Sequence, residues 1–185
     1  QTLITDLYQL TMLQGYFKDN RTEEEATFDY FYRTPPAGGS YLISAGLEKV
    51  LDYLEHLYFS EEDITYLRAI GLFDEDFLEF LRGFRFTGKV VGVSEGTIVF
   101  PRESILRVTA PLPQAQYVET FILNAMNFQS LIATEVSRFT LASENIPFVE
   151  NANPWSQGQA HLDVSRGAFI AGASATTSIS AAKRL

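Results

Sequence analysis

The sequence contains no cysteine and only two histidines among its 185 residues. Without cysteine the chain forms neither a disulfide nor a thiolate metal site. His56 lies in an apolar helical pattern and His161 in a polar stretch far along the chain. We therefore expect no metal site and a structural role for each histidine. The absence of thiols fits a reducing compartment, and we expect a cytoplasmic protein.

Basic residues are also scarce. Lys and Arg number 14 against 23 Asp and Glu, which gives a net charge of −9, and no run of five basic residues occurs. Binding to nucleic acid needs clustered Lys and Arg that face the phosphates, so this class of partner is not expected. A phosphorylated small molecule would need a local basic pocket built against the overall negative field.

Long hydrophobic runs are missing as well. The longest uncharged stretches, Thr120–Thr134 and Gly167–Ala182, contain polar residues and are shorter than the ~20 apolar residues of a membrane helix. No signal-peptide pattern opens the chain. The sequence also has no G-x-G-x-x-G, Walker A or H-E-x-x-H motif. We expect no association with membranes, and these motifs identify no catalytic residue.

Apolar residues make up 46% of the chain, with 15 Phe and nine Tyr, as in one large or two small globular domains. Thr5–Phe17 predicts a helix with Thr5 as its N-cap, and Ala26–Arg33 predicts a strand covered on both faces. The remaining periodic segments predict helices over 47–54, 60–71 and 74–83, β segments over 89–93, 97–100 and 105–109, a helix from Pro113 to about Ser143 with a break near Asn127, a strand over 148–152 and a helix over 162–172.

Four sequence blocks carry a resemblance. They are Thr5–Met12 (TDLYQLTM), Phe28–Arg33 (FDYFYR) with the glycine loop that follows it, Glu95–Glu103 (EGTIVFPRE) and Asn127–Thr134 (NFQSLIAT). In order and spacing they resemble the N-terminal portion of the nicotinate phosphoribosyltransferase family over nearly the whole chain. The first and last blocks argue against a weaker alternative, the related quinolinate enzyme family.

The resemblance implies a mixed α/β fold. An N-terminal sandwich-like domain is expected over residues 1–110, and a helical segment with the start of an irregular β/α barrel over 111–185. The family belongs to NAD salvage, a branch of NAD biosynthesis. Its members join nicotinate to phosphoribosyl pyrophosphate, giving nicotinate mononucleotide and pyrophosphate, usually with ATP hydrolysis and Mg²⁺. They form dimers, so a homo-oligomer, or a second chain that completes the barrel, is expected.

The resemblance also implies three substrate-binding residues. Tyr8 is the family candidate for contacting the pyridine ring across the dimer interface, because an aromatic face stacks on a flat ring and its hydroxyl reaches a carboxylate. Arg138 is placed to aim at a phosphate, although an i,i+3 ion pair with Glu135 is the alternative. Arg166 lies in a stretch that resembles the family's next helix. No catalytic residue and no metal ligand are assigned.

The sequence departs from the family at Asn151–Gln157, where Pro154 and Trp155 stand in place of two arginines. Arginine binds a phosphate with two charged hydrogen bonds, which neither replacement can donate. The family's phosphate-accepting histidine and later phosphate-binding loops are expected beyond Leu185. We therefore expect the 185-residue chain alone to be inactive. It is either part of such an enzyme or a non-catalytic homologue that serves as a dimerisation or scaffold module.

Overall fold

The computed structural model describes residues 2–144 and 146–185, which divide into two compact units assembled from separate chain segments. Unit 1 consists of Gln1–Asp29, Lys49–Val91 and Leu106–Leu123, and unit 2 consists of Tyr30–Glu48, Gly92–Ile105 and Asn124–Leu185. Both units mix helices with short strands, which confirms the expected fold class. The division into family domains at residue 110 stays a prediction.

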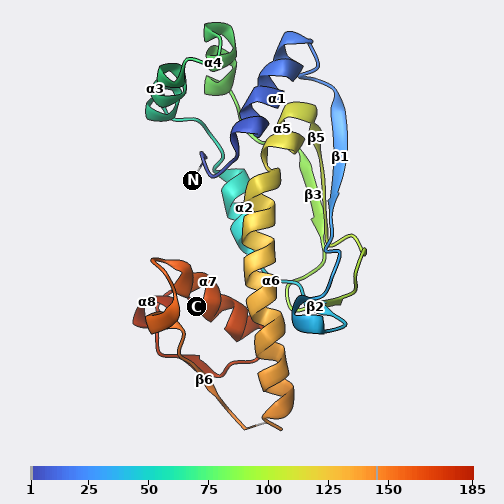
Figure 1. Cartoon of the computed structure of the whole chain (residues 1–185), viewed down its shortest axis with the longest axis vertical. Coiled ribbons are helices and arrows are strands. Elements are labelled where there is room, and N and C mark those ends of the chain that lie inside the picture. Colours follow the sequence, from blue (N-terminus) through green and yellow to red (C-terminus); the bar gives the residue numbers. More distant parts are fainter. Residues whose placement is uncertain (1, 145) are drawn as a thin grey trace. The chain divides into compact units, whose positions relative to one another are not determined.

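Helices and short strands follow one another along the whole chain (Figure 1). In order they are α1 (Leu7–Lys18), β1 (Glu25–Tyr30), the 3₁₀ turn η1 (Pro36–Gly38), β2 (Leu42–Ile43), α2 (Leu47–Glu55), α3 (Glu61–Ile70), α4 (Glu75–Arg82), β3 (Lys89–Gly92), β4 (Ile98–Val99), β5 (Leu106–Pro111), α5 (Leu112–Tyr117), α6 (Glu119–Ala142), β6 (Val149–Glu150), η2 (Asn153–Trp155), α7 (Ala160–Ile170), β7 (Ala175–Thr176) and α8 (Ile179–Ala182).

The helices of unit 1 begin and end mostly where local signals predict. Ser60 and Asp63 form a capping box at the start of α3, and Gly71 ends the helix in the left-handed conformation with φ 74°. The expected cap of α1 is wrong, because Asp6, and not Thr5, occupies the N-cap position. Local hydrogen-bonding chemistry thus fixes α3 more firmly than α1.

Aromatic rings fill the core of unit 1. Phe59, Phe84 and Tyr117 contact one another with ring centroids 5.3 to 5.7 Å apart. Three strands form a sheet in the order β1, β5, β3. The expectation that the first strand is covered on both faces is wrong, since Phe28 within it and Phe31 just beyond it are exposed. The aromatic content therefore supplies both this core and an exposed apolar surface.

In unit 2 a polar row on α6 binds the chain segment that leads into α2. The Ser130 hydroxyl accepts from the Ala45 amide and donates to the Ala45 carbonyl, both at 3.0 Å. The Thr134 hydroxyl accepts from the Ile43 amide at 2.9 Å. Ser130 and Thr134 are fully buried, so these bonds satisfy polar groups that water does not reach. The block Asn127–Thr134 is therefore a docking face for backbone.

Helix α6 runs through Asn127 without the expected break, so that prediction is wrong. The side-chain oxygen of Asn127 accepts a hydrogen bond from the Tyr30 hydroxyl at 2.8 Å. An asparagine bonded outside its own helix no longer competes for that helix's backbone groups. The break lies instead at Val118, between α5 and α6.

Unit 2 ends in a β–α–β arrangement. Strands β6 and β7 pair in parallel, Val149 with Ala175 and Glu150 with Thr176, and α7 connects them. This is the repeating unit of a β/α barrel, although the described residues contain no closed barrel. None of the described helices is long and apolar enough to cross a membrane.

Gly46 lies in the segment just before α2, at the point where this segment packs against α6. It offers a test of how close that packing is. Its φ is +104°, and an added Cβ would lie 2.8 Å from the Ala125 carbonyl oxygen. Gly46→Ala should therefore lower the free energy of unfolding by about 3 kcal/mol, combining backbone strain and overpacking. Urea unfolding followed by circular dichroism measures this loss.

Gly71→Ala is the control, because its φ is also positive but no atom lies within 4 Å of the added Cβ. It should cost about 1 kcal/mol. Equal losses in the two variants would show that the close approach at Gly46 is not a real constraint.

Candidate functional site

The carboxyl ends of the two parallel strands carry a cluster of polar side chains. Glu150, the last residue of β6, accepts hydrogen bonds from the Thr176 hydroxyl at 2.6 Å and the Ser165 hydroxyl at 2.7 Å. Thr176 is the last residue of β7, and Ser165 lies on α7. In β/α barrels this end of the strands holds the active site. The cluster is therefore the first candidate for a functional position.

The charge of Glu150 decides what this cluster can do. Burial alone would raise the pKa of its carboxyl, but the hydrogen bonds from Thr176, Ser165 and the Ala152 amide outweigh burial and lower the pKa below its usual value. Glu150 is thus an anion at neutral pH. It orders the two hydroxyl groups and would repel a phosphate placed beside it.

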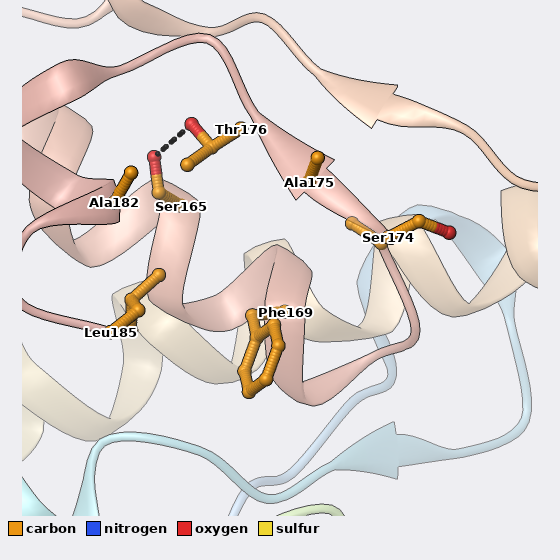
Figure 2. A pocket seen from close by; sticks show the side chains of 8 residues that line it. Ser165, Phe169, Ser174, Ala175, Thr176, Ala182 and Leu185 are labelled. Carbon is orange, nitrogen blue, oxygen red and sulfur yellow. Dashed lines mark hydrogen bonds between the residues drawn. The ribbon is translucent and has the colours of Figure 1, made fainter.

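A cavity of about 200 Å³ lies next to these hydroxyls. Figure 2 shows Ser165 and Thr176 facing each other, from α7 and β7, with their oxygens 3.1 Å apart. Phe169 and Leu185 contribute apolar walls. The volume is below the roughly 300 to 1,000 Å³ of typical ligand pockets, which is too small to enclose a whole nucleotide.

Arg166, a predicted substrate contact, lies in an ion-pair network in unit 2. It donates to both carboxylate oxygens of Glu95, at 2.8 and 2.6 Å, to Glu48, and to the Gln129 side chain at 3.2 Å. Its side chain is 21% exposed and that of Glu95 is 18% exposed. The guanidinium is therefore bound by two carboxylates, of which Glu48, at 74% exposure, is the one open to solvent.

Glu95 also accepts hydrogen bonds from the backbone at the start of α2. Its Oε1 atom receives the amides of Gly46 and Leu47 at 2.6 and 2.9 Å. Burial would raise the pKa of the Glu95 carboxyl, but the hydrogen bond and charge of Arg166, followed by these two amides, lower it. Within unit 2, the network thus connects the start of α2, Gln129 of α6, α7 and the turn at Glu95.

Arg138, the second predicted arginine, has different partners. Its guanidinium donates to the Pro36 carbonyl at 3.1 Å and forms the i,i+3 ion pair with Glu135 at 3.3 Å. A Cβ at Gly39 would collide with this guanidinium, so the glycine allows the loop to pack against it. The structural alternative is present, and the phosphate contact stays a prediction.

Tyr8 lies on α1 in unit 1 and is 48% exposed. Its hydroxyl accepts a hydrogen bond at 2.9 Å from Gln9, which is fully buried and also donates to Glu119 at 2.7 Å. Gln116 donates in turn to the Gln9 oxygen at 2.7 Å. A hydroxyl that accepts one hydrogen bond keeps its own proton to donate. Tyr8 can therefore donate to an acceptor that reaches α1.

The buried amide of Gln9 was not predicted from the sequence. One signal was available, since Gln9 shares the buried face of α1 with Leu10 and Leu13. A polar residue on such a face must find hydrogen-bond partners. Of the predicted site residues, Arg138 and Arg166 lie in unit 2, each with its own partners, and Tyr8 lies in unit 1.

The divergent stretch Asn151–Gln157 forms the short turn η2, in which Trp155 is exposed. The side-chain oxygen of Asn151 accepts from the Thr177 hydroxyl at 2.8 Å, which ties the stretch to the residue after β7. Of the histidines, His56 contacts Asp52, and His161 bonds the Gly158 carbonyl and the Ser180 hydroxyl. These contacts fit the structural roles expected for both.

The segment Gly92–Gly96 (GVSEG) fits the spacing of the G-x-S-x-G motif. In hydrolases that serine stands between a strand and a helix. Here Ser94 lies in a turn between β3 and β4, and both histidines bond other partners. The segment therefore has neither the backbone context nor the base of a hydrolase nucleophile.

Replacing Arg166 with glutamine tests the ion-pair network. The change leaves the largely buried Glu95 carboxylate with neutral partners, so the free energy of unfolding at pH 7 should fall by about 3 kcal/mol. Urea unfolding measures the loss. Arg107→Gln removes the more exposed ion pair with Asp29 and, as the control, should cost less than about 1 kcal/mol.

Acid should abolish the difference between the native chain and Arg166→Gln. Because folding lowers the pKa of Glu95, the unfolded state binds more protons, and the stabilisation is present above the ordinary glutamate pKa of ~4.3. It is lost as pH falls through the lowered pKa of the folded state. A difference in the free energy of unfolding that stays constant as the pH falls from 7 through the lowered pKa of the folded state would show that this ion pair does not stabilise the fold.

Comparisons with known proteins agree with the four sequence blocks. The family model of the nicotinate phosphoribosyltransferase N-terminal domain matches residues 3–127. A nicotinate phosphoribosyltransferase of Mycobacterium tuberculosis is 40% identical over 183 residues, which cover 98% of this chain and 39% of that protein. The Bacillus subtilis nicotinate phosphoribosyltransferase is also 40% identical, over 99% of this chain and 38% of its own length.

A solved structure shows the same likeness in three dimensions. The crystal structure of human nicotinic acid phosphoribosyltransferase matches 98% of this chain and 37% of its own, with a TM-score of 0.90 and 30% identity. The chain thus spans about two fifths of the length of the relatives it matches. With the β–α–β arrangement and the docking face on α6, these matches show that the chain belongs to the nicotinate phosphoribosyltransferase family, as its N-terminal portion.

Proposed function

We propose that this chain is the N-terminal part of an enzyme that joins nicotinate to phosphoribosyl pyrophosphate and releases pyrophosphate. The observation that carries the proposal is the 40% identity over nearly the whole chain to two nicotinate phosphoribosyltransferases. Because the chain covers 39% and 38% of their lengths, the activity is proposed for the whole protein. The 185 residues alone are proposed to be inactive.

Within this proposal Tyr8 contacts nicotinate. Its ring is exposed, and the hydrogen bond from buried Gln9 leaves the hydroxyl proton free for a carboxylate. Leu7 and Met12 are also exposed on α1 and give the helix an apolar surface. Such a surface favours association, which supports a homo-oligomer in which α1 meets the site of a second subunit.

Arg138 and Arg166 are the proposed phosphate contacts, and they differ in the ion pair that each must break to bind a phosphate. Arg138 would exchange an ion pair with Glu135 for a phosphate. Arg166 would have to leave Glu48 while Glu95 continues to hold it. The exchange at Arg166 needs the smaller movement, since its partner Glu48 is exposed. However, the Glu95 carboxylate, which stays paired with Arg166, repels the incoming anion.

ATP and Mg²⁺ belong to the proposed reaction as well. Within residues 2–144 and 146–185, no group of three or more His, Asp or Glu side chains is placed to hold a metal ion. The described residues therefore do not fit a metal site. We assign none of them to Mg²⁺ or ATP and derive no step through either.

A second candidate function is a non-catalytic module for dimerisation or scaffolding in the cytoplasm. The sequence of the Asn151–Gln157 turn favours it, because the stretch supplies an exposed tryptophan and no cationic side chain. An exposed aromatic ring suits contact with another protein. The two functions differ in what the chain does when it is joined to a complete barrel.

A chimera separates the two functions. The chain would replace the aligned residues of the Bacillus subtilis relative, and nicotinate-dependent release of pyrophosphate would be measured. The isolated chain should give no release above background, and the chimera should give turnover. Turnover by the purified isolated chain would refute the proposed inactivity, and an inactive but folded chimera would favour the scaffold.

The same chimera tests Tyr8. Tyr8→Phe keeps the ring and removes the hydroxyl, so the KM for nicotinate should rise about tenfold through loss of a hydrogen bond to a charged group. Tyr66→Phe, at an exposed position on α3, is the matched control and should leave the KM unchanged. An unchanged KM in Tyr8→Phe would mean that the hydroxyl does not bind the substrate.

A further inference from the structure

The buried side chain of Gln9 supports the proposed nicotinate contact Tyr8. Gln9 is fully buried on α1, whereas Tyr8, the residue before it, is 48% exposed. A buried amide must satisfy its two N–H groups and its oxygen within the protein. The partners of Gln9 therefore determine which way its amide faces and how it acts on the Tyr8 hydroxyl.

Glu119 fixes the orientation of the Gln9 amide. The Gln9 Nε2 atom lies 2.7 Å from the Glu119 Oε2 atom. Glu119 is exposed and is the first residue of α6, where the helix dipole favours a negative charge. A carboxylate accepts hydrogen bonds and donates none, so the nitrogen of Gln9, and not its oxygen, must face Glu119.

Gln116 fixes the same orientation from the oxygen side of the amide. Its Nε2 atom donates to the Gln9 oxygen at 2.7 Å and approaches the Glu119 Oε2 atom at 3.4 Å. If the oxygen and nitrogen of Gln9 were exchanged, two acceptors would face each other at Glu119 and two donors at Gln116. All of these side chains belong to unit 1, so the orientation is determined within that unit.

The second N–H of Gln9 determines what the Tyr8 hydroxyl can do. With one N–H bonded to Glu119, the other donates to the Tyr8 oxygen at 2.9 Å. The Tyr8 oxygen therefore accepts on this side, and its proton lies on the other side of the oxygen, where an acceptor can reach it. A phenol without this neighbour can turn and either donate or accept. The hydrogen bond from Gln9 thus makes Tyr8 a donor.

We propose that Gln9 is a positioning residue that makes the site select a carboxylate over a carboxamide. This inference rests on the proposed function, in which Tyr8 contacts nicotinate. The carboxylate of nicotinate only accepts hydrogen bonds, whereas nicotinamide carries an NH₂ group that only donates, beside its carbonyl. A hydroxyl held as a donor favours the carboxylate, because both of its oxygens accept and because a hydrogen bond to a charged group is the stronger one.

The hydrogen bond between Gln9 and Tyr8 can be tested without turnover. In heteronuclear NMR spectra of the 185-residue chain, the two side-chain amide protons of Gln9 should give separate signals that exchange slowly with water. Tyr8→Phe removes the acceptor of one proton and should shift its signal more than that of the other. Tyr66→Phe, at an exposed position on α3, is the control and should shift neither. If Tyr8→Phe leaves both Gln9 signals unchanged, the hydrogen bond does not form and the proposal fails.

An exchange of two side chains reverses the hydrogen bond to Tyr8. In the double variant Gln9→Glu with Glu119→Gln, the carboxylate at position 9 accepts from the amide at position 119, from Gln116 and from Tyr8, whose proton then faces inward. Net charge and side-chain size are kept. In the chimera with the Bacillus subtilis relative, the KM for nicotinate should rise about tenfold at unchanged kcat, through loss of a hydrogen bond to a charged group. The inhibition constant of nicotinamide should not rise.

Combination with Tyr8→Phe separates positioning from general damage to the site. If Gln9 acts through the Tyr8 hydroxyl, the double variant with Tyr8→Phe added should have the same KM as Tyr8→Phe alone. Effects that multiply to about a hundredfold would show that the exchange acts independently of Tyr8, and would overturn the proposal. An equal rise in the inhibition constant of nicotinamide would overturn it as well.

Gln9→Met is a second variant, because it keeps the length of the side chain and buries no charge. It frees the Tyr8 hydroxyl to turn, so the KM for nicotinate should rise a few-fold while nicotinamide inhibits at least as strongly as before. Gln14→Met, on the same helix, is the matched control. It removes an amide that bonds the backbone of Leu72 and Asp74, and it should leave both constants unchanged. An unchanged KM in Gln9→Met would contradict the positioning role.

Failure of the proposed function would give a different result. A folded chimera that has native residues at all of these positions and gives no turnover would refute that function, and the positioning role of Gln9 with it. The NMR signals would still show whether the hydrogen bond exists. A chimera that turns over nicotinate with the same KM in every variant would overturn the inference about Gln9 and leave the proposed function standing.

Discussion

The ion pair between Glu95 and Arg166 is the constraint on which the arrangement of unit 2 depends. One carboxylate receives a guanidinium from α7 and two backbone amides from the start of α2. The same guanidinium bonds Gln129 on α6. Since both charged groups are largely buried, removing either one leaves the other without compensation. Within unit 2, a single pair of opposite charges therefore ties together the start of α2, the part of α6 around Gln129 and α7.

This constraint also limits where an anion can bind. The N-terminus of a helix is a common phosphate site, because its free amides and dipole attract negative charge. At α2 the amides of Gly46 and Leu47 already bond the Glu95 carboxylate. The start of α2 is thus occupied by the protein's own anion. Glu150 has the same effect at the carboxyl ends of β6 and β7, where its charge orders two hydroxyl groups.

The helix ends and the helix periodicity depend on residues close in sequence, so they could be predicted. Hydrogen bonds and ion pairs between residues far apart in the sequence could not. The Ser60 and Asp63 capping box, the glycine at the end of α3 and the periodicity of α2 each depend on neighbours within one or two turns. Arg166 was recognised as a candidate residue, but its carboxylate partners are 71 and 118 positions away. The helix break expected near Asn127 is wrong for the same reason, because Tyr30, which donates to its side chain, is 97 positions away.

The excess of acid over base bears on how such a chain could hold a phosphorylated substrate. Arg138 and Arg166, the two proposed phosphate contacts, both pair with carboxylates, so an anion that binds either one must displace a partner. The energy of displacement is lower for Arg138 than for Arg166. Arg138 is 34% exposed and holds one carboxylate from its own helix at 3.3 Å, whereas Arg166 is 21% exposed and holds Glu95 with two hydrogen bonds. An ion pair between residues three apart on a helix contributes only about 0.5 kcal/mol. Of the two proposed phosphate contacts, Arg138, beside the glycine loop at Gly39, is therefore the one whose ion pair an anion would break at the smaller energetic cost.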